Sequence, residues 1–244
     1  MDKQRLSAIA AEFGTPSFVF DEGALSRRMR EIKSIVGNSV HLCYSIKANP
    51  FLIPAMQSLV ELLEVCSPGE LEICESLRVD PKTILFSGVN KTLADIEHAM
   101  DAGVVRFTAE SPLHIRLLEQ AAAKRDTVYP VLLRLTAGTQ FGMDESDLLS
   151  AIANRASYPH LRFEGIHYFS GTQRAKLDKD QRKELVMLSE FMDRLQQDYG
   201  FVCEKIEYGP GLYFPTSRTR ITATPSPPSA LSRRIFSSLL SAAS

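Results

Sequence analysis

The stretch HLCYSIKANP, residues 41–50, has the pattern of an apolar β-strand that ends on a lysine and a turn. Lys47 stands where the strand stops, and Ala48, Asn49 and Pro50 follow it. Burying an ammonium group without a partner costs several kcal/mol in practice. We therefore expect Lys47 to lie at a strand end where its amine has a specific task.

The alternation of short apolar runs and amphipathic stretches continues along the chain. From residue 41 onward it gives seven strand–helix alternations, of which the seventh strand lacks a convincing helix after it. Repeated βα units with nearly continuous apolar strands are typical of a parallel sheet covered by helices. The expected fold class is α/β, a (β/α)8-type TIM barrel. An open, doubly wound sheet is the alternative, disfavoured because no GxGxxG motif follows the first strand.

In a barrel of this kind, the carboxyl ends of the strands converge on one mouth, where the chemistry takes place. A short strand at 17–20 (SFVF) and a helix at 23–36 come first, so residues 1–36 are expected to lead into a barrel formed by residues 37–214. A long helix is expected at 180–199. The residues predicted to end the seven strands are Lys47, Ser67, Gly88, Glu110, Leu135, Phe169 and Gly209.

Composition excludes several classes of function. The formal net charge of −1 gives no overall field that would attract nucleic acid or an anionic membrane. No cysteine pair has CxxC spacing, so we expect no metal site, and Cys43, Cys66 and Cys203 are predicted to be buried. The N-terminus has no apolar signal segment and the chain has no apolar run of 18 residues, so a cytoplasmic location without a membrane partner is expected.

Small and hydroxyl residues follow the sixth and seventh strands, as SGT at 170–172 and GPG at 209–211. Loops at this place in a barrel commonly form a phosphate pocket from backbone N–H groups and hydroxyls. A lysine across the mouth from such a pocket is the geometry that a pyridoxal phosphate (PLP) enzyme requires. Taken singly, each feature has a plainer interpretation: Lys47 as a solvated strand end, the glycines as an ordinary turn, Ser67 as a helix cap and His167 as a core histidine.

Six motifs occur in order along the chain: YSIKAN, VCSPGEL, ILFSGVNKT, FGM, GIHYFSGTQ and EYGPG. Together they resemble the fold-type III PLP-dependent decarboxylases, the ornithine/diaminopimelate/arginine decarboxylase family with an alanine-racemase-like barrel. The resemblance covers about residues 15–214. It implies PLP as cofactor, a small amino acid as substrate and a homodimer for the full-length form, but it does not name the amino acid.

The resemblance also assigns residues. Lys47 matches the catalytic lysine that holds PLP as a Schiff base, and Glu64 falls where the family usually has an aspartate near the cofactor ring. Arg134 matches an arginine that faces the cofactor. Ser67, Gly69 and Glu70 match a small-residue-plus-Glu motif at the end of the second strand, Thr172 matches a hydroxyl residue that binds the phosphate, and Gly209 and Gly211 match the outer glycines of the phosphate loop.

Two positions depart from the family pattern. Phe169 replaces a histidine that stacks on the cofactor ring; a phenyl ring can stack, but it cannot exchange a proton. His167 lies two residues away and thus on the same face of the strand, where it either compensates by binding at the cofactor site or belongs to the core. Pro210 stands in the middle of the glycine loop and removes one backbone donor.

Residues 215–244 differ in composition from the rest, with four arginines and no acidic residue. By the resemblance, an eighth strand with a Glu-Pro-Gly-Arg motif and a C-terminal β-domain should follow the glycine loop, and neither pattern is found. We expect an incomplete barrel, a tail that results from a reading-frame shift at about Pro215 or is a natural disordered segment, and no decarboxylase activity for this chain by itself.

Two other functions remain open at this point. One is a single-domain PLP carrier or homeostasis protein, which uses the same barrel without a β-domain. The other is a non-catalytic barrel kept for binding or assembly. The SPGEL and GVNKT motifs favour the decarboxylase, because they belong to that branch of the resemblance.

Overall fold

The computed structural model describes residues 2–174 and 177–211, without the side chains of residues 177–179. The expectations for the tail at 215–244 therefore lie outside the described residues. The chain divides into two units, Met1–Val40 and His41–Ser244.

The first unit contains two helices, α1 (Lys3–Phe13) and α2 (Glu22–Val36). Each begins at an aspartate whose carboxylate caps the first turn, Asp2 for α1 and Asp21 for α2. The helix predicted at 23–36 is confirmed, but the strand predicted at 17–20 is wrong, because this segment forms no strand. Strand formation needs a neighbouring strand to satisfy the backbone N–H and C=O groups, and the described residues pair none with it.

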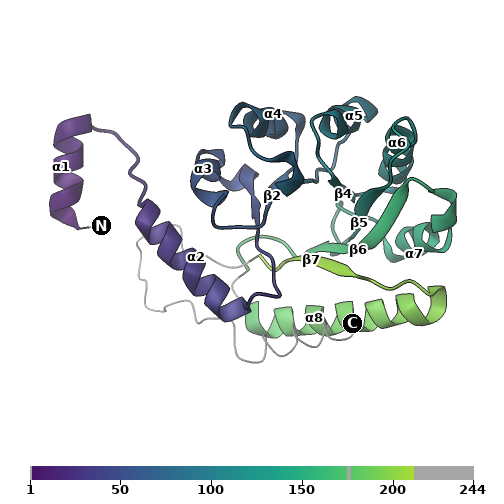
Figure 1. Cartoon of the computed structure of the whole chain (residues 1–244). Coiled ribbons are helices and arrows are strands. Elements are labelled where there is room, and N and C mark those ends of the chain that lie inside the picture. The colour runs from purple at the N-terminus through teal and green to yellow at the C-terminus, as the bar shows by residue number, and fades with distance from the viewer. Residues whose placement is uncertain (1, 175–176, 212–244) are drawn as a thin grey trace. The chain divides into compact units, whose positions relative to one another are not determined.

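The second unit is a curved parallel sheet with helices outside it (Figure 1). The strands pair in chain order from β1 to β7, and every neighbouring pair is parallel. The strands are β1 (Cys43–Ser45), β2 (Leu62–Val65), β3 (Ile84–Phe86), β4 (Arg106–Ala109), β5 (Tyr129–Leu135), β6 (Leu161–Phe169) and β7 (Lys205–Gly209), and the helices are α3 (Ile53–Met56), α4 (Pro68–Ser76), α5 (Leu93–Asp101), α6 (Pro112–Ala123), α7 (Glu145–Ala153) and α8 (Leu177–Tyr199).

This strand order decides between the two predicted architectures. A doubly wound sheet reverses its strand order at a switch point, whereas here each strand lies beside the next one along the chain. The α/β barrel class is therefore confirmed, in incomplete form. Within the described residues, β1 and β7 are the two edges of a seven-stranded sheet.

The main core lies between the sheet and its helices. Phe86, Phe107 and Tyr129 come from three successive strands and meet edge to face, with ring centroids 6.1 and 5.7 Å apart. Edge-to-face pairs of this kind add stabilisation beyond the burial of apolar area. On the outside, α5 begins at Thr92, which forms a reciprocal capping box with Asp95.

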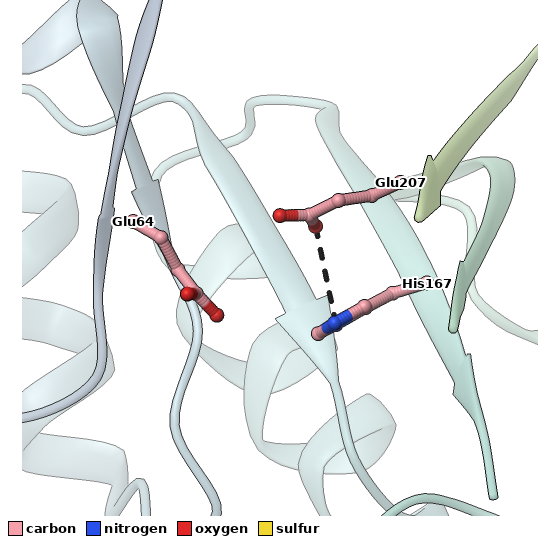
Figure 2. Close-up of side chains that lie close together, drawn as sticks. All are labelled: Glu64, His167 and Glu207. Carbon is pink, nitrogen blue, oxygen red and sulfur yellow. Dashed lines mark ion pairs between the residues drawn. The ribbon is translucent and has the colours of Figure 1, made fainter. Parts of the chain in front are cut away.

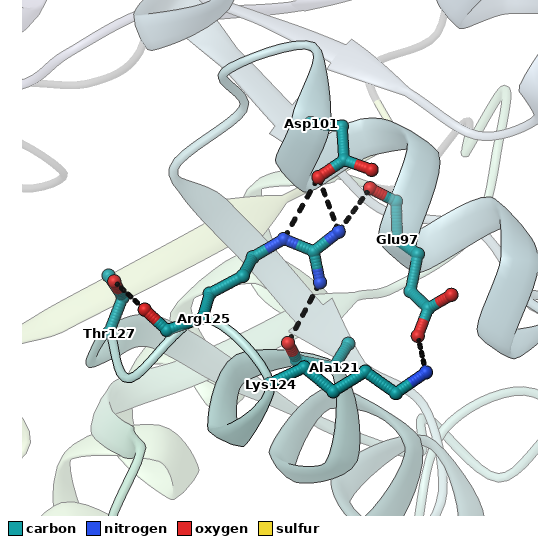
Figure 3. A network of polar contacts seen from close by, with 6 residues as sticks. All are labelled: Glu97, Asp101, Ala121, Lys124, Arg125 and Thr127. Atoms are coloured by element: carbon teal, nitrogen blue, oxygen red, sulfur yellow. Dashed lines mark hydrogen bonds and ion pairs between the residues drawn. The ribbon is translucent and has the colours of Figure 1, made fainter.

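A polar network joins neighbouring helices α5 and α6 on the outside of the sheet (Figure 3). Arg125, just after α6, donates to the Asp101 carboxylate at 3.0 Å and to the backbone carbonyls of Glu97 and Ala121 at 3.1 and 2.9 Å. Lys124 pairs with the Glu97 carboxylate. One guanidinium thus bridges two helices, which helps to keep the barrel repeats in register.

A bulge in β6 sets the register of three side chains near the site. The pairing of β5 with β6 shifts between Val131 and Leu132, so that Glu164 has no partner in the register. A side chain at Gly165 is impossible, because a Cβ there would lie 1.8 Å from the Lys205 carbonyl oxygen on β7. Beyond the bulge, Arg134 pairs with His167, and His167 pairs with Glu207. Residues in register on adjacent strands point to the same face.

The cysteines are partly as predicted. Cys203 is buried and Cys66 is half-buried, but Cys43 is exposed because β1 is an edge strand within the described sheet. All four cysteines are free thiols. Among the described helices, none combines the length and the apolar character that crossing a membrane requires.

Candidate functional site

Lys47 lies at the carboxyl end of β1, in a short 3-10 turn formed by Ile46–Ala48. Ile46 is fully buried and anchors this turn, while the Lys47 side chain is 55% exposed. Its Nζ lies 3.8 Å from Glu64 Oε2, 3.5 Å from Cys66 Sγ and 5.9 Å from the centre of the Phe169 ring. Partial burial lowers the pKa of Lys47, but Glu64 and Cys66 outweigh this effect and the pKa lies above its ordinary value.

Glu64 supplies the charge that partners this amine. It lies on β2 next to β1, with its side chain 13% exposed. Burial raises the pKa of Glu64, but the Lys47 ammonium and the hydroxyls of Ser45 and Ser87 lower it by more. The pKa of Glu64 therefore lies below its ordinary value. Glu64 is therefore ionised at neutral pH. Burial and the Glu64 charge raise the pKa of Cys66 to about 12, so its thiol is neutral.

His167 and Glu207 lie in register on β6 and β7 and extend into the space in front of Glu64 (Figure 2). His167 Nδ1 is 3.9 Å from Glu207 Oε2. One donor atom from each of Glu64, His167 and Glu207 lies within 4.8 Å of the other two, so the group is compact enough to share one proton or one cation. Burial lowers the pKa of His167 to about 4, although the Glu64 charge opposes this, and its imidazole is neutral.

The interpretation of His167 as an ordinary core histidine is only half right. The side chain is indeed buried, at 6% exposed. However, its Nδ1 has no hydrogen-bond partner among the described residues, and neither has Glu207 Oε2. Glu207 was not predicted as a site residue. Its signal in the sequence was an acidic residue inside an otherwise strand-like run, two residues before Gly209 and thus on the same face.

Arg134 forms a second buried charge pair on the same face of the sheet. Its Nη1 lies 2.6 Å from Glu110 Oε1 at the end of β4, and its guanidinium lies 5.5 Å from the Phe141 ring centre. Lys91 is also buried and donates from Nζ to the Gly88 carbonyl at 2.5 Å. Burial lowers the pKa of Lys91 to about 8, although Glu110 acts in the opposite direction.

The loops after β6 and β7 are joined by backbone hydrogen bonds. The N–H of Ser170 donates to the Gly209 carbonyl at 3.0 Å, and the N–H of Arg174 donates to the Gly211 carbonyl at 2.9 Å. Gly211 has φ +67°, and a Cβ there would lie 2.0 Å from the Gly171 carbonyl oxygen. The lack of a side chain at Gly211 lets the two loops approach more closely than any other residue would allow. The exposed Thr172 side chain lies on the β6 loop.

Phe169 and Gly209 form the link between the lysine and these loops. A Cβ at Gly209 would lie 2.5 Å from Phe169 Cδ2, so the ring packs directly on the glycine backbone. The Lys47 amine lies over the same ring, 5.9 Å from its centre. Lys47, Phe169 and Gly209 therefore form one continuous surface, while Thr172 and Gly211 lie beyond it on the joined loops.

Ser67 and its neighbours have a structural role in this arrangement. The Ser67 hydroxyl accepts from the Glu70 N–H at 3.2 Å and begins α4, which confirms the helix-cap interpretation. The Glu70 carboxylate accepts from the Cys66 N–H at 2.8 Å. Gly69 lies in the first turn with open space around the position of a Cβ. This motif fixes the end of β2 next to Glu64.

A parallel βα barrel with a lysine after its first strand and joined glycine loops after its sixth and seventh strands fits the class of barrels that bind pyridoxal phosphate. The family described as "Pyridoxal-dependent decarboxylase, pyridoxal binding domain" matches residues 22–226. The chain belongs to this family, and PLP is the cofactor of its barrel.

Curated relatives and solved structures agree with this assignment. The L-glutamyl-[BtrI acyl-carrier protein] decarboxylase of Niallia circulans is 28% identical over 88% of this chain and 54% of its own length. The diaminopimelate decarboxylase of Zymomonas mobilis is 31% identical over 69% of this chain and 45% of its own length. The chain thus spans about half the length of these relatives.

A solved structure of similar fold is the diaminopimelate decarboxylase from M. jannaschii in complex with L-lysine. It is 20% identical, covers 97% of this chain and 58% of its own, and has a TM-score of 0.78. At this level of identity the likeness bears on the fold. It supports the sequential winding of the sheet from β1 to β7 described above.

Proposed function

We propose that this chain is the cofactor-binding part of a PLP-dependent amino-acid decarboxylase, and that Lys47 holds PLP as a Schiff base. The observation that carries the proposal is a half-exposed lysine at the mouth of the sheet, 3.8 Å from an ionised carboxylate and beside joined glycine loops. When bound, PLP supplies the electron sink for the charge left behind by departing CO2.

The chain's own residues bind and orient the cofactor. Lys47 provides the amine, and Glu64 holds a negative charge beside it that orients the ammonium and balances its charge. Phe169 offers a flat apolar face for the cofactor ring. Thr172, Gly209 and Gly211 provide a hydroxyl and close backbone approach for the phosphate.

Arg134 and His167 are proposed as cofactor-site residues of a different kind. Arg134 is paired with Glu110 at 2.6 Å, so its charge is already balanced and its position is fixed. His167 is neutral and extends toward Glu64, with one of its ring nitrogens within 4.8 Å of a Glu64 carboxylate oxygen. Both shape the polarity around the amine rather than compensate for the absent stacking histidine.

The substrate class is an α-amino acid with a free carboxylate, either free or attached to a carrier protein. The named relatives support this breadth, since one acts on an L-glutamyl group on an acyl-carrier protein and another on diaminopimelate. Because the chain spans about half of these relatives, the reaction is proposed for the whole protein, as a homodimer. The four free cysteines fit a reducing cytoplasm.

The test is covalent labelling of the amine. Purified protein mixed with PLP should gain an absorbance band characteristic of an imine, and borohydride reduction should place the cofactor on Lys47. Lys47→Ala should abolish the band and the label, whereas Lys82→Ala, a change at an exposed lysine just before β3 and thus at the opposite ends of the strands, should leave both intact. A label on Lys91 in place of Lys47 would overturn the proposal.

A PLP carrier without decarboxylase activity is separated by a second measurement. Such a protein would bind PLP on the same lysine and release no CO2 from any amino acid, even in its full-length form. A non-catalytic barrel would fail already at the absorbance step.

A further inference from the structure

Two buried polar atoms near Lys47 face each other without a hydrogen bond. His167 Nδ1 and Glu207 Oε2 face each other at 3.9 Å, and within residues 2–174 and 177–211 neither has a hydrogen-bond partner. Both side chains point into the space in front of Glu64 (Figure 2). Buried polar atoms without partners are strongly disfavoured. A single hydrogen between the two atoms would satisfy both after a small approach.

Three states could provide this hydrogen: an imidazolium at His167, a neutral His167 with its proton on Nδ1 that donates to an ionised Glu207, or a protonated Glu207 that donates to Nδ1. The first is excluded at neutral pH. Burial lowers the pKa of His167 to about 4, and although the Glu64 charge opposes this shift, the cations of Arg134, Lys47 and Lys91 act in the same direction as burial.

The second state would place two ionised carboxylates together in a buried site. Glu207 and Glu64 have carboxylate oxygens within 4.8 Å of each other, and the Lys47 amine already pairs with Glu64 at 3.8 Å. Arg134 is paired with Glu110. Two carboxylates this close in a desolvated site do not both stay ionised.

Burial and the neighbouring Glu64 carboxylate favour a proton on Glu207. Together they raise its pKa to about 8, although Arg134, Lys47 and a hydrogen bond with Cys43 oppose this shift. The titratable and charged groups that face it are Cys43 from β1, Lys47 from the turn after β1, Glu64 from β2, Arg134 from β5 and His167 from β6.

We propose that Glu207 is a positioning residue that carries a proton at neutral pH and donates it to His167 Nδ1, so that Glu64 alone of this cluster is ionised beside Lys47. The Nε2 proton of His167 is then left to face the Glu64 side of the cluster. In this state the ammonium of Lys47 is balanced by one carboxylate. When Glu207 ionises at higher pH, a second negative charge enters the site and holds the proton on Lys47 more tightly, which disfavours attack on an aldehyde.

The inference about Lys47 rests on the proposed function, but the proton on Glu207 is measured without cofactor. Infrared difference spectra of the PLP-free protein should show the carbonyl band of a protonated carboxyl group at about pH 6. This band should disappear as the pH rises through about 8. Glu207→Gln should lack the band, while Glu204→Gln, a change at an exposed carboxylate just before β7, should retain it.

A second readout reports the effect on the lysine. The rate at which Lys47 reacts with an amine-modifying reagent should be the same in wild type and Glu207→Gln at about pH 6, and roughly two- to threefold faster in the variant at about pH 9. A residue that only stabilises the fold would change neither ratio with pH. Glu207→Asp, which keeps an acid at this place, should shift the infrared band if Glu207→Gln fails to fold.

The proposal is overturned if wild type has no such band at low pH, if the band survives in Glu207→Gln, or if the Lys47 reaction rates of the two proteins remain equal at high pH. Failure of PLP to label Lys47 while the band behaves as expected would count against the proposed function and leave the proton on Glu207 in place. The two proposals thus fail separately.

Discussion

At the scale of single residues, two opposing effects set the protonation state of Lys47, just after β1. Partial burial favours the neutral amine, whereas the carboxylate of Glu64 favours the ammonium, and the carboxylate prevails. Because the Lys47 side chain is 55% exposed, water screens this pair and its contribution to stability is small. The pair is therefore better explained by chemistry at the mouth of the sheet than by folding.

Thr172 allows the predicted phosphate site to be tested by removing one hydroxyl. Its side chain is exposed, so Thr172→Val should leave the free energy of unfolding nearly unchanged. Loss of one charge-assisted hydrogen bond should weaken PLP binding by about 1.5–3 kcal/mol, to be measured by absorbance titration. Thr127→Val, at an exposed position at the opposite ends of the strands, is the matched control. Equal PLP affinity in both variants would show that the phosphate does not bind at Thr172.

At the scale of elements, α8 holds the ends of β6 and β7 together through one carboxylate. Glu184 accepts hydrogen bonds from Ser170 after β6 and from the Tyr208 hydroxyl on β7, both at 2.7 Å, and pairs with Arg174 at 2.5 Å. Burial and this hydrogen bond to Glu184 raise the pKa of Tyr208 well above its ordinary value. The helix thus fixes the loop after β6 and the end of β7, which precedes the second loop proposed to hold the phosphate.

Glu184→Gln should therefore affect cofactor binding without touching the cofactor. The amide cannot pair with Arg174 and cannot accept both hydroxyl protons equally well, so we expect a loss of about 1–3 kcal/mol in the free energy of unfolding. PLP affinity should fall severalfold as the loops separate. Glu190→Gln, an exposed carboxylate on the same helix, should change neither quantity. A less stable protein with unchanged PLP affinity would show that these loops do not hold the phosphate.

Local patterns predicted most elements, and long-range pairing decided the rest. The helices expected at 23–36 and 180–199 are found as Glu22–Val36 and Leu177–Tyr199, because helical periodicity and caps are local. The segment at 17–20 has strand composition, but a strand exists only with a partner. Glu207 was missed for a related reason: its proximity to Glu64 follows from the curvature of the sheet, which no local pattern encodes.

The candidate site divides in the same way. Lys47, Phe169 and Gly209 could be placed together because each ends a strand or follows one, and parallel strand ends share one edge. The Arg134–Glu110 pair could not be predicted in full, since it depends on the register of β4 and β5, in which Ala109 pairs with Leu133 and the two charged residues follow directly. Predicting a side-chain pair across two strands therefore requires knowledge of the strand register, whereas predicting which strand ends lie together requires only the topology of the sheet.

At the scale of the whole molecule, several buried groups make stability depend on pH. Burial lowers the pKa of His114 to about 4, with Lys91 acting in the same direction, and His167 behaves alike. Both take up protons more readily when unfolded, so the stability that they contribute is present above about pH 6.5 and is lost as the pH falls towards about 4. Glu207 acts oppositely, and its contribution is lost as the pH rises from about 4.5 to about 8.

Urea unfolding across this range should therefore show a maximum of stability in the weakly acidic to neutral region, with an acid-side loss on the order of 2–3 kcal/mol from each buried histidine. His114→Gln should flatten the acid side, because the amide oxygen can accept the Glu110 N–H as Nδ1 does at 3.3 Å but cannot titrate. His41→Gln, at an exposed position, should keep the wild-type slope. If the free energy of unfolding still falls with pH on the acid side in His114→Gln and in a variant with both His114 and His167 changed to Gln, other groups cause this loss of stability.

The seven-stranded sheet also bears on turnover by the 244 residues alone. By family resemblance, the glutamate that pairs with the pyridine nitrogen and the arginine that binds phosphate belong to an eighth strand, and β1 and β7 are edges within the described residues. Loss of one such charge-stabilising group typically lowers a rate by about 10²–10³. We expect this chain to bind PLP on Lys47 yet release no measurable CO2 from ornithine, lysine, arginine or diaminopimelate. The reading-frame shift expected at about Pro215 is tested by reading the DNA after codon 214 in a shifted frame: the resulting protein should release CO2 from at least one of these amino acids, and its Lys47→Ala variant should not. Robust CO2 release by the 244-residue chain would show that the residues described here already contain a complete decarboxylase site.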